Sequence, residues 1–401
     1  MTDLFESQRR RRLVLREGKE RAISNRHPWI FSGAILHDDG PEDAAIGDLF
    51  DRSGTLLASG LYSAHSQIRL RAMTFGQPFE FQVLIDRIRA ALEFRRSIRP
   101  EGTDALRLIH AEGDRIGGLI VDRFADLLVV EITSAGLDRL RDAVVEVLQD
   151  EERPRGILLA NDGPARRIER LPQESEVIGD FPDEVTIREH GLVFVIEPRQ
   201  GQKTGFFIDQ RENRRRLRGM SEGKDVLNLF AYSGGFGVYA MAGGARSVEE
   251  VDISQRAIAL ARRNHELNGS LTPDVRFTVA DAFEHVRTLD AGGKRFDLIV
   301  CDPPAFARSR KDVEKAARGY KDINRQSLRL VREGGYLLTF SCSGHIDANL
   351  FQKILFAAAL EAKREVAIVG KMGAGLDHPV SIYCPESEYL KGLVLRVGNQ
   401  M

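Results

Sequence analysis

The sequence predicts an α/β protein whose second half, after about residue 191, is a doubly wound sheet. In that half strands, glycine turns and helices alternate, which is typical of a mostly parallel sheet with helices on both faces. Short alternating apolar runs predict a small β-unit over 1–74, and a mixed pattern predicts an α+β segment over 75–190. The length of 401 residues also favours two or three domains.

Composition excludes several classes of protein. Hydrophobic residues make up 42% and charged residues 29%, which is globular composition. With 58 Lys and Arg against 59 Asp and Glu, a globally basic nucleic-acid binder is excluded, but local basic patches are not. No apolar run approaches the roughly 18 residues of a membrane span, and a charged start ending in Arg9–Arg12 argues against a signal peptide. Three cysteines without paired spacing predict neither a disulfide framework nor a metal site, and we expect a cytoplasmic protein.

The first half contains several local signals. Asp51–Gly54 lies between apolar runs and predicts a hairpin turn. Apolar residues at three- and four-residue spacing predict helices over 83–97 and 138–148, with strands joined by Gly/Asp turns between them. No catalytic group is expected in 75–190, because its acids near turns are typical of surface turn chemistry.

Four positions at the ends of successive predicted strands suit a nucleotide-like ligand. Small residues in the turn Asn228–Gly235 let the backbone approach a ligand closely. Asp252 follows, where a carboxylate can accept both ribose hydroxyls, although it could instead cap the next helix. Asp281 precedes Ala282–Phe283, an apolar edge suited to adenine, and the prolines of Asp302–Pro304 form a rigid lip.

Charge and glycine spacing refine the choice of ligand. The dinucleotide pattern GxGxxG is absent, which disfavours a nicotinamide dehydrogenase. Seven Lys/Arg stand against two acids over 199–218, and nine stand against three over 308–332. RNA phosphates are the natural partner of such runs, although solvated helix faces can also carry them.

Four N-terminal strings resemble a PUA domain, an RNA-binding module of many RNA-modifying enzymes: Gly18–Arg21, His27–Ile35, Gly60–Tyr62 and Ser66–Arg69. The order of the four strand-end positions resembles the class I S-adenosylmethionine-dependent methyltransferases, which have a Rossmann-like fold. More narrowly, the whole chain resembles the bacterial large-subunit ribosomal RNA methyltransferase I family, which makes 5-methylcytosine in 23S rRNA. Its most specific strings are Gln202–Arg211, Asn228–Phe236, Asp302–Phe306 and Phe340–Gly344.

This resemblance implies an organisation, a cofactor and a partner. Residues 1–74 would form the PUA-like domain, a small β-barrel, 75–190 an α+β middle domain and 191–401 the methyltransferase domain. The cofactor would be S-adenosylmethionine and the partner 23S rRNA in an unassembled or partly assembled large subunit, with no membrane and no metal; a homodimer is left open. The implied cofactor-binding residues are Phe230, Ala231, Tyr232, Ser233, Gly234, Asp252, Ile253, Asp281, Ala282, Asp302 and Gln210. The implied RNA-binding residues are Lys203, Arg211, Arg214, Arg215, Phe306 and Arg308.

Methylation at carbon 5 of cytosine needs an activated cysteine. Carbon 5 is a poor nucleophile until a thiolate adds to C6, so a cysteine must lie near the methyl donor. Cys342 follows an apolar strand and is the expected nucleophile, with a small buried hydrophobe as its alternative. Cys301 precedes Asp302, so strand alternation points it into the core. Related enzymes often carry a second cysteine after the prolines, where this chain has Ala305, so the base for the elimination step is not identified.

Two other functions stay open. An exocyclic-amine methyltransferase would carry [Asn/Asp]-Pro-Pro-aromatic, but Ala305 occupies the aromatic position and Phe306 comes one residue late. A noncatalytic RNA-binding protein is the other alternative. The intact acids Asp252, Asp281 and Asp302, together with Cys342, argue against it. In the leading hypothesis Asp302 is catalytic and hydrogen-bonds the cytosine N3/N4 edge, and Phe306 or Phe340 stacks on an extruded base.

Overall fold

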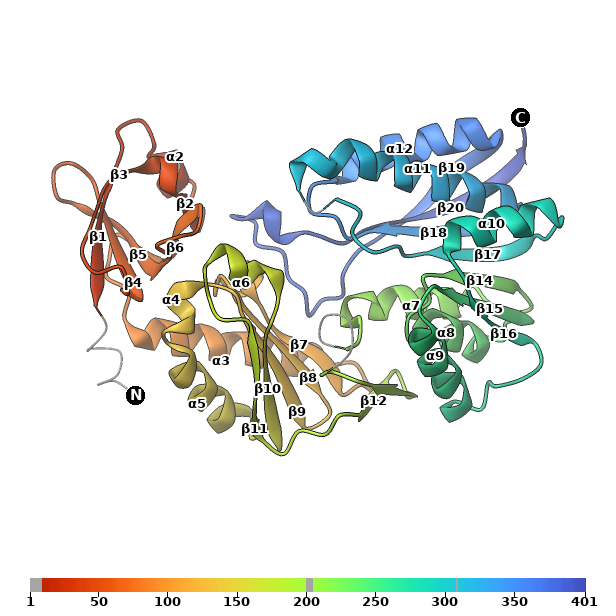
Figure 1. The fold of residues 1–401 in the computed structure, drawn as a ribbon, viewed down its shortest axis with the longest axis horizontal. Helices are drawn as coiled ribbons and strands as arrows, with labels where there is room; N and C mark the ends of the chain where they lie inside the picture. Colours follow the sequence, from red (N-terminus) through yellow and green to blue (C-terminus); the bar gives the residue numbers. More distant parts are fainter. Residues whose placement is uncertain (1–8, 200–204, 308) are drawn as a thin grey trace. The chain divides into compact units, whose positions relative to one another are not determined.

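The computed structural model describes residues 9–199, 205–307 and 309–401 (Figure 1). The described chain forms two compact units. Unit 1 comprises the described residues up to 185, together with those in 197–205 and 376–387. Unit 2 comprises the described residues in 186–196, 206–375 and 388–401. The segment Leu376–Ser387, which comes from the second half of the sequence, packs in unit 1.

Unit 1 contains a six-stranded sheet of order β2-β6-β5-β4-β1-β3 (Figure 1). The strands are β1 (Arg10–Leu15), β2 (Trp29–Phe31), β3 (Ile35–Asp39), β4 (Ile46–Phe50), β5 (Leu56–Tyr62) and β6 (Ile68–Phe75), with a short helix α2 (Arg21–Ser24). Alternating apolar residues such as Leu13, Leu49 and Leu70 form its core. The predicted hairpin is confirmed, because β4 and β5 pair antiparallel and Asp51 N donates to Thr55 O at 3.0 Å.

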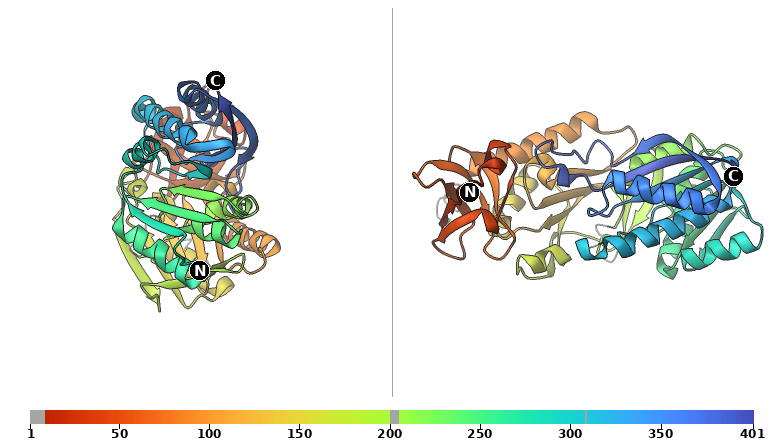
Figure 2. Two further views of the ribbon diagram at one scale, coloured as in Figure 1. Left: turned by 90° about the vertical axis from the view of Figure 1, so that its right-hand side faces the viewer. Right: turned by 90° about the horizontal axis from the view of Figure 1, so that it is seen from above.

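The second sheet of unit 1 has the order β11-β10-β9-β8-β7. Its strands are β7 (Ala105–His110), β8 (Leu119–Phe124), β9 (Leu127–Ile132), β10 (Gly156–Asn161) and β11 (Glu174–Gly179). Its helices are α3 (Phe81–Ile98), α4 (Ala135–Asp138), α5 (Arg141–Glu152) and α6 (Pro164–Ile168), with the turn η2 (Ala111–Asp114). The long helix α3 is the orange helix in the right-hand view of Figure 2. Helix α3 extends the predicted 83–97 at both ends, whereas α5 begins after the predicted 138 because the separate turn α4 precedes it.

Unit 2 is built on a seven-stranded sheet of order β16-β15-β14-β17-β18-β20-β19. Its strands are β14 (Asp225–Leu229), β15 (Ser247–Asp252), β16 (Val275–Val279), β17 (Phe296–Cys301), β18 (Val331–Ser341), β19 (Arg364–Met372) and β20 (Lys391–Gln400). Its helices are α7 (Arg211–Arg218), α8 (Gly235–Ala242), α9 (Gln255–Leu267), α10 (Ala282–Ala291), α11 (Val313–Leu330) and α12 (Ala348–Ala362). A hairpin of β12 (Val185–Glu189) and β13 (Leu192–Ile196) precedes it.

Both faces of this sheet are apolar because helices cover both. Leu227 of β14 packs in a cluster with α10, α11 and α12, whereas its neighbour Val226 packs in another with α7 and α8 (Figure 1). The first five strands in this order are parallel, and β20 joins them antiparallel. The predicted doubly wound sheet is therefore confirmed. In the part of the chain that the structure describes, no helix is long and apolar enough to cross a membrane.

Candidate active site

The strand-end residues singled out from the sequence share one edge of the sheet in unit 2. Strands β14, β15, β16, β17 and β18 are parallel, so their carboxyl ends meet at that edge. The chain proceeds from β14 to β15 and β16 on one side and then to β17 and β18 on the other. A ligand site in such a sheet lies where the strand order reverses, which here is between β14 and β17.

The glycine-rich turn after β14 has an unusual backbone. Phe230, Tyr232 and Gly234 have positive φ angles of 61°, 47° and 72°. A Cβ on Gly234 would lie 2.8 Å from the Ala261 Cβ, so only glycine fits there without a shift. Left-handed non-glycine residues cost about 1–3 kcal/mol each and cluster at ligand sites. The turn Phe230–Gly234 thus has a preformed backbone that a ligand can approach closely, and we call it the cradle.

Asp252 holds this turn and keeps capacity for a ligand. Its Oδ2 accepts from Tyr232 N at 3.0 Å and its Oδ1 from Ser254 N at 2.9 Å. The helix α9 is capped by Ser254, whose hydroxyl accepts from Ala257 N, so the alternative of Asp252 as that cap is wrong. Because a carboxylate oxygen has two lone pairs, both oxygens can still accept from ribose hydroxyls. Ile253 beside it is 72% exposed and offers an apolar surface to a purine.

Asp281 has a structural role that the sequence did not assign. It caps helix α10, because its Oδ1 accepts from Phe283 N at 2.9 Å and from Glu284 N at 3.1 Å. The adjacent Ala282 is buried, and Phe283 packs edge to face on Phe230. These residues frame the apolar end of the cradle.

Asp302 is oriented by a buried amide chain. Gln210 Nε2 donates to Asp302 Oδ2 at 2.9 Å, and Asn213 Nδ2 donates to Gln210 Oε1 at 2.6 Å. The second bond fixes which end of the Gln210 amide faces the carboxylate. Sequence reasoning missed Asn213, since only its position one helical turn after Gln210 could have indicated it.

Cys342 follows β18 and is half-buried, with its Sγ 3.9 Å from Pro303 O of the predicted lip. The next residue, Ser343, anchors it: Lys391 Nζ donates to Ser343 O at 2.8 Å, and the hydroxyls of Ser343 and Tyr320 are 3.0 Å apart. Burial lowers the pKa of Lys391, while the charge of the Cys342 thiolate acts in the opposite direction. Sequence reasoning missed Lys391, whose signal is a single cation at the start of the apolar strand β20.

The other cysteines lie in apolar surroundings. Cys301 is fully buried, and burial holds its pKa far above the ordinary value, so its prediction as a core residue is confirmed. Cys384 of unit 1 is also buried, which raises its pKa to about 12. Cys342 is the one cysteine of the three that reaches the surface at the sheet edge.

Within the described ranges one group of three potential metal donors lies close together, namely His27, Cys384 and Glu386 of unit 1. His27 Nδ1 accepts from Trp29 N at 3.1 Å, so in the neutral ring Nε2 carries the proton and faces Glu386 at 3.3 Å. A proton on Nε2 and a buried thiol make this a hydrogen-bonded cluster rather than a set of free donor atoms.

The predicted RNA-binding residues differ in exposure, and two of them, Arg211 and Arg214, are buried. Arg214 is buried and donates from Nε and Nη2 to the two oxygens of buried Glu189, each at 2.7 Å. Arg211 is likewise buried, with its Nε 3.3 Å from Glu212 Oε1. Neither guanidinium is presented to solvent, because helix α7 directs both inward as part of the fold.

Arg215 of the same helix is exposed, whereas Lys203 and Arg308 lie outside the described residues. Phe306 packs on Tyr320 and Phe283, with ring centroids 4.6 and 6.1 Å apart. The basic run after the lip divides into two parts. Its later members form ion pairs with acids of unit 2, and its earlier described members are exposed: Arg310, Lys311, Lys315 and Arg318.

The fold and this edge define a class I S-adenosylmethionine-dependent methyltransferase, and comparisons with known proteins agree. Residues 171–367 match the S-adenosylmethionine-dependent methyltransferase family and residues 13–75 match a PUA-like domain. The chain is 43% identical to the ribosomal RNA large subunit methyltransferase I of Aeromonas hydrophila, over 96% of this chain and 98% of that protein. The Escherichia coli relative of the same name is 40% identical, over 96% and 99%. The chain belongs to the ribosomal RNA large subunit methyltransferase I family.

Solved structures show the same fold. A crystal structure described as a methyltransferase complexed with SAH is 21% identical, with a TM-score of 0.84, over 96% of this chain and 100% of that one. A second, named a SAM-dependent methyltransferase of Streptococcus mutans, is 22% identical with a TM-score of 0.83 over the same shares. The predicted family and the PUA-like and methyltransferase domains are confirmed. S-adenosylmethionine is the cofactor, and the left-handed cradle, the free lone pairs of Asp252 and exposed Ile253 fit it.

Proposed function

We propose that the protein methylates carbon 5 of a cytosine in 23S rRNA through a covalent adduct with Cys342. The observation that carries this proposal is the position of Cys342: half-buried at the end of β18, against the Asp302–Pro304 lip, on the edge that also holds Asp252. The relatives' shared name, ribosomal RNA large subunit methyltransferase, supports an RNA substrate.

In this reaction the Cys342 thiolate adds to C6 of the cytosine and the C5–C6 double bond is lost. Its electron pair moves to C5, which becomes the nucleophilic carbon of an enamine with a C4–C5 double bond. Bound S-adenosylmethionine supplies an electrophilic methyl group on a sulfonium sulfur. Once C5 carries the methyl group, loss of the C5 proton to a base expels the thiolate and restores the aromatic ring. The same cysteine therefore returns to its starting state.

The surroundings of Cys342 favour its thiolate. The Lys391 ammonium is anchored on the carbonyl of the following residue, at 2.8 Å from Ser343 O, and its charge attracts a negative sulfur. Because Lys391 is buried, the interaction is screened less by water than a surface pair would be. Lys391 thus acts as a positioning residue that makes Cys342 a better nucleophile.

In this proposal Asp302 meets the N3/N4 edge of the base. Its Oδ2 accepts a hydrogen bond from Gln210 Nε2 at 2.9 Å, which fixes the carboxylate in position. A carboxylate there stabilises positive charge that develops at N3 as the adduct forms. Asn213 and Gln210 hold it in that orientation.

The cofactor would lie along the cradle. We assign it to Phe230, Ala231, Tyr232, Ser233, Gly234, Asp252, Ile253, Asp281, Ala282, Asp302 and Gln210. Exposed Arg215 and the exposed cations after the lip would contact RNA phosphates. An extruded base needs accessible single-stranded RNA, so we propose an unassembled or partly assembled large subunit in the cytoplasm as the substrate. Light scattering would show whether the protein also forms a homodimer.

Bisulfite sequencing of 23S rRNA tests this function. A strain lacking the gene should lose protection from bisulfite conversion at one cytosine, and the wild-type gene should restore it. Restoration should fail with Cys342→Ala. An unchanged bisulfite pattern, together with loss of a methyl group on an exocyclic amine by mass spectrometry, would favour amine methylation instead.

A further inference from the structure

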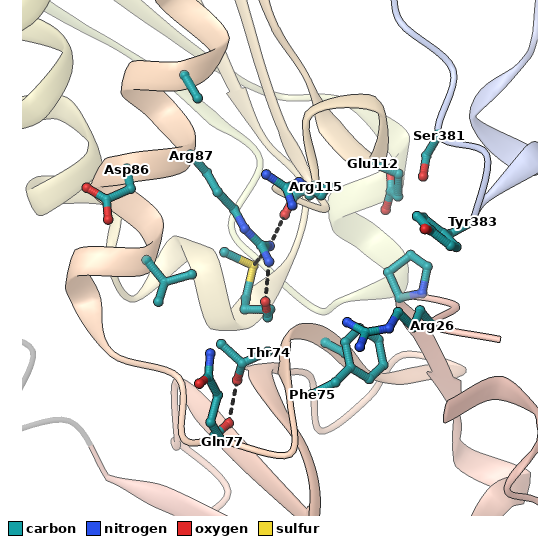
Figure 3. A pocket seen from close by; sticks show the side chains of 15 residues that line it. Arg26, Thr74, Phe75, Gln77, Asp86, Arg87, Glu112, Arg115, Ser381 and Tyr383 are labelled. Carbon is teal, nitrogen blue, oxygen red and sulfur yellow. Dashed lines mark hydrogen bonds between the residues drawn. The ribbon is translucent and has the colours of Figure 1, made fainter. Parts of the chain in front are cut away.

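A cavity of about 650 Å³ lies within unit 1, where the end of β6, helix α3, the turn η2 and residues 381–383 meet (Figure 3). Its volume is in the range of binding sites for small ligands. Three arginines line it, Arg26, Arg87 and Arg115, together with the acids Asp86 and Glu112. The proposed methyl-transfer chemistry uses none of these residues.

Arg87 of α3 lacks an acidic partner. Its guanidinium donates to Met73 O and Arg115 O, and its Nη1 lies 3.2 Å from the Met73 sulfur, all of which are uncharged acceptors (Figure 3). Burial, reinforced by the positive charge of Arg115, lowers the pKa of Arg87 to about 10. Among the residues that the structure describes, no carboxylate forms an ion pair with it. A half-buried cation without a counter-ion is costly unless a ligand supplies the negative charge.

Other arginines with little solvent exposure in unit 1 have a carboxylate as counter-ion. Each donates to a carboxylate at hydrogen-bond distance: Arg71 to Glu169, Arg95 to Asp114, Arg107 to Asp122 and Arg166 to Asp138. Arg87 therefore departs from the pattern of its own unit, and it does so at the wall of a cavity.

The acids of the cavity do not compensate for it. Glu112 Oε1 accepts from Trp29 Nε1 at 2.8 Å, and Asp86 Oδ1 accepts from Gln82 Nε2 at 2.7 Å. The arginines outnumber the acids by one, since three guanidinium groups face two carboxylates. Arg26 and Arg115 are both exposed and have left-handed backbones, with φ of 52° and 62°, so turns rather than regular elements present them at the rim.

Aromatic rings complete the wall. The Arg26 guanidinium lies over the Phe75 ring at 5.8 Å, and Tyr383 is 53% exposed on the same side of the cavity (Figure 3). Guanidinium groups for a phosphate beside aromatic rings for a base are the combination that binds single-stranded nucleic acid. An acidic peptide would use the cations but would leave these rings without a partner.

We propose that this cavity binds one nucleotide of the RNA substrate, with a phosphate at Arg87 and Arg115 and the base against Tyr383 or Phe75. This proposal rests on the proposed function, because it takes RNA as the substrate. It gives unit 1 a defined anchoring site outside the residues that perform methyl transfer. Such an anchor contributes binding alone, so its loss should raise KM for RNA and leave kcat unchanged.

Fluorescence anisotropy with a short fluorescein-labelled single-stranded RNA tests the anchor. Arg87→Gln and Arg115→Gln should each weaken binding by about tenfold, the loss of one charge-assisted contact. Each should also reduce the slope of log K against log salt by about 0.7, the value for one phosphate contact on a single strand. Arg89→Gln is the matched control: it removes a charge from the same helix, but Arg89 pairs with Glu151 and does not line the cavity.

Tyr383→Ala should weaken RNA binding by at least about fivefold without changing the salt slope, because stacking carries no charge. Arg115 and Tyr383 are exposed, so these variants should fold even if Arg87→Gln does not. The proposed nucleotide site would be wrong, and the proposed function would stand, if two results came together. Arg115→Gln and Tyr383→Ala would bind RNA with wild-type affinity and salt slope, and the wild type would still bind and methylate RNA. A wild type that neither binds nor methylates rRNA would overturn the proposed function. Adenosine monophosphate that displaces the RNA and binds as tightly would reassign the cavity to a small molecule.

Discussion

Replacing Asp252 should weaken S-adenosylmethionine binding for a reason that the structure makes specific. Its carboxylate already accepts from Tyr232 N at 3.0 Å and Ser254 N at 2.9 Å, and its remaining lone pairs are those assigned to the ribose. A hydrogen bond to a charged group contributes about 1.5–3 kcal/mol. Asp252→Ala should therefore raise the Kd about 10- to 150-fold, as measured by isothermal titration calorimetry.

Two variants separate this effect from damage to the turn. Asp252→Asn keeps an acceptor for Tyr232 N but loses the charge and turns an NH2 donor toward Ser254 N, so its Kd should rise, but less than that of Asp252→Ala. Ser254→Ala removes the α9 cap and should cost about 1 kcal/mol of stability while leaving the Kd unchanged. A cofactor analogue without ribose hydroxyls should bind wild type and Asp252→Ala equally. Unchanged affinity for the intact cofactor in Asp252→Ala would refute the ribose assignment.

Two further predictions concern buried charges of unit 2. Arg214→Met should lower the free energy of unfolding, measured by chemical denaturation, by about 3–5 kcal/mol, because the buried Glu189 carboxylate loses its counter-ion. The double variant Arg214→Met/Glu189→Leu should recover most of that loss. An Arg214→Met variant as stable as the wild type would mean that the ion pair does not stabilise the fold. Lys391→Met should shift the acid limb of the activity profile to higher pH, because the Cys342 thiolate loses a nearby cation. An acid limb that stays at the wild-type pH would mean that Lys391 does not help to activate the thiol.

Much of the fold could be predicted because its signals are local. Strand, glycine turn and helix alternate with clear punctuation after residue 191, as in β15, α9 and β16 of the sheet that this pattern predicts. The excursion of Leu376–Ser387 into unit 1 was not predictable in this way. Its packing depends on residues distant in sequence, such as Arg95, whose Nη2 donates to Asp377 O at 2.9 Å, and no periodicity records such a contact.

The candidate site was predictable in its positions but not in its electrostatics. Strand ends identify Asp252, Asp302 and Cys342, because parallel strands bring them to one edge. A run of arginines, however, does not reveal which guanidinium groups point inward: Arg214 is buried against Glu189 whereas adjacent Arg215 is exposed. Helical phase decides this, and the acid that receives Arg214 lies on the distant strand β12.

Trapping with 5-fluorocytosine tests most directly whether Cys342 is the nucleophile. Fluorine at C5 cannot leave as a proton does, so an RNA containing this base should become covalently linked to the wild-type protein in the presence of S-adenosylmethionine. The linked species should be retained by Cys301→Ala, since Cys301 is buried with a strongly raised pKa, and should be absent from Cys342→Ala. Denaturing electrophoresis with the labelled RNA measures both. An adduct that persists in Cys342→Ala, or that fails to form with the wild type while methylation proceeds, would contradict the account.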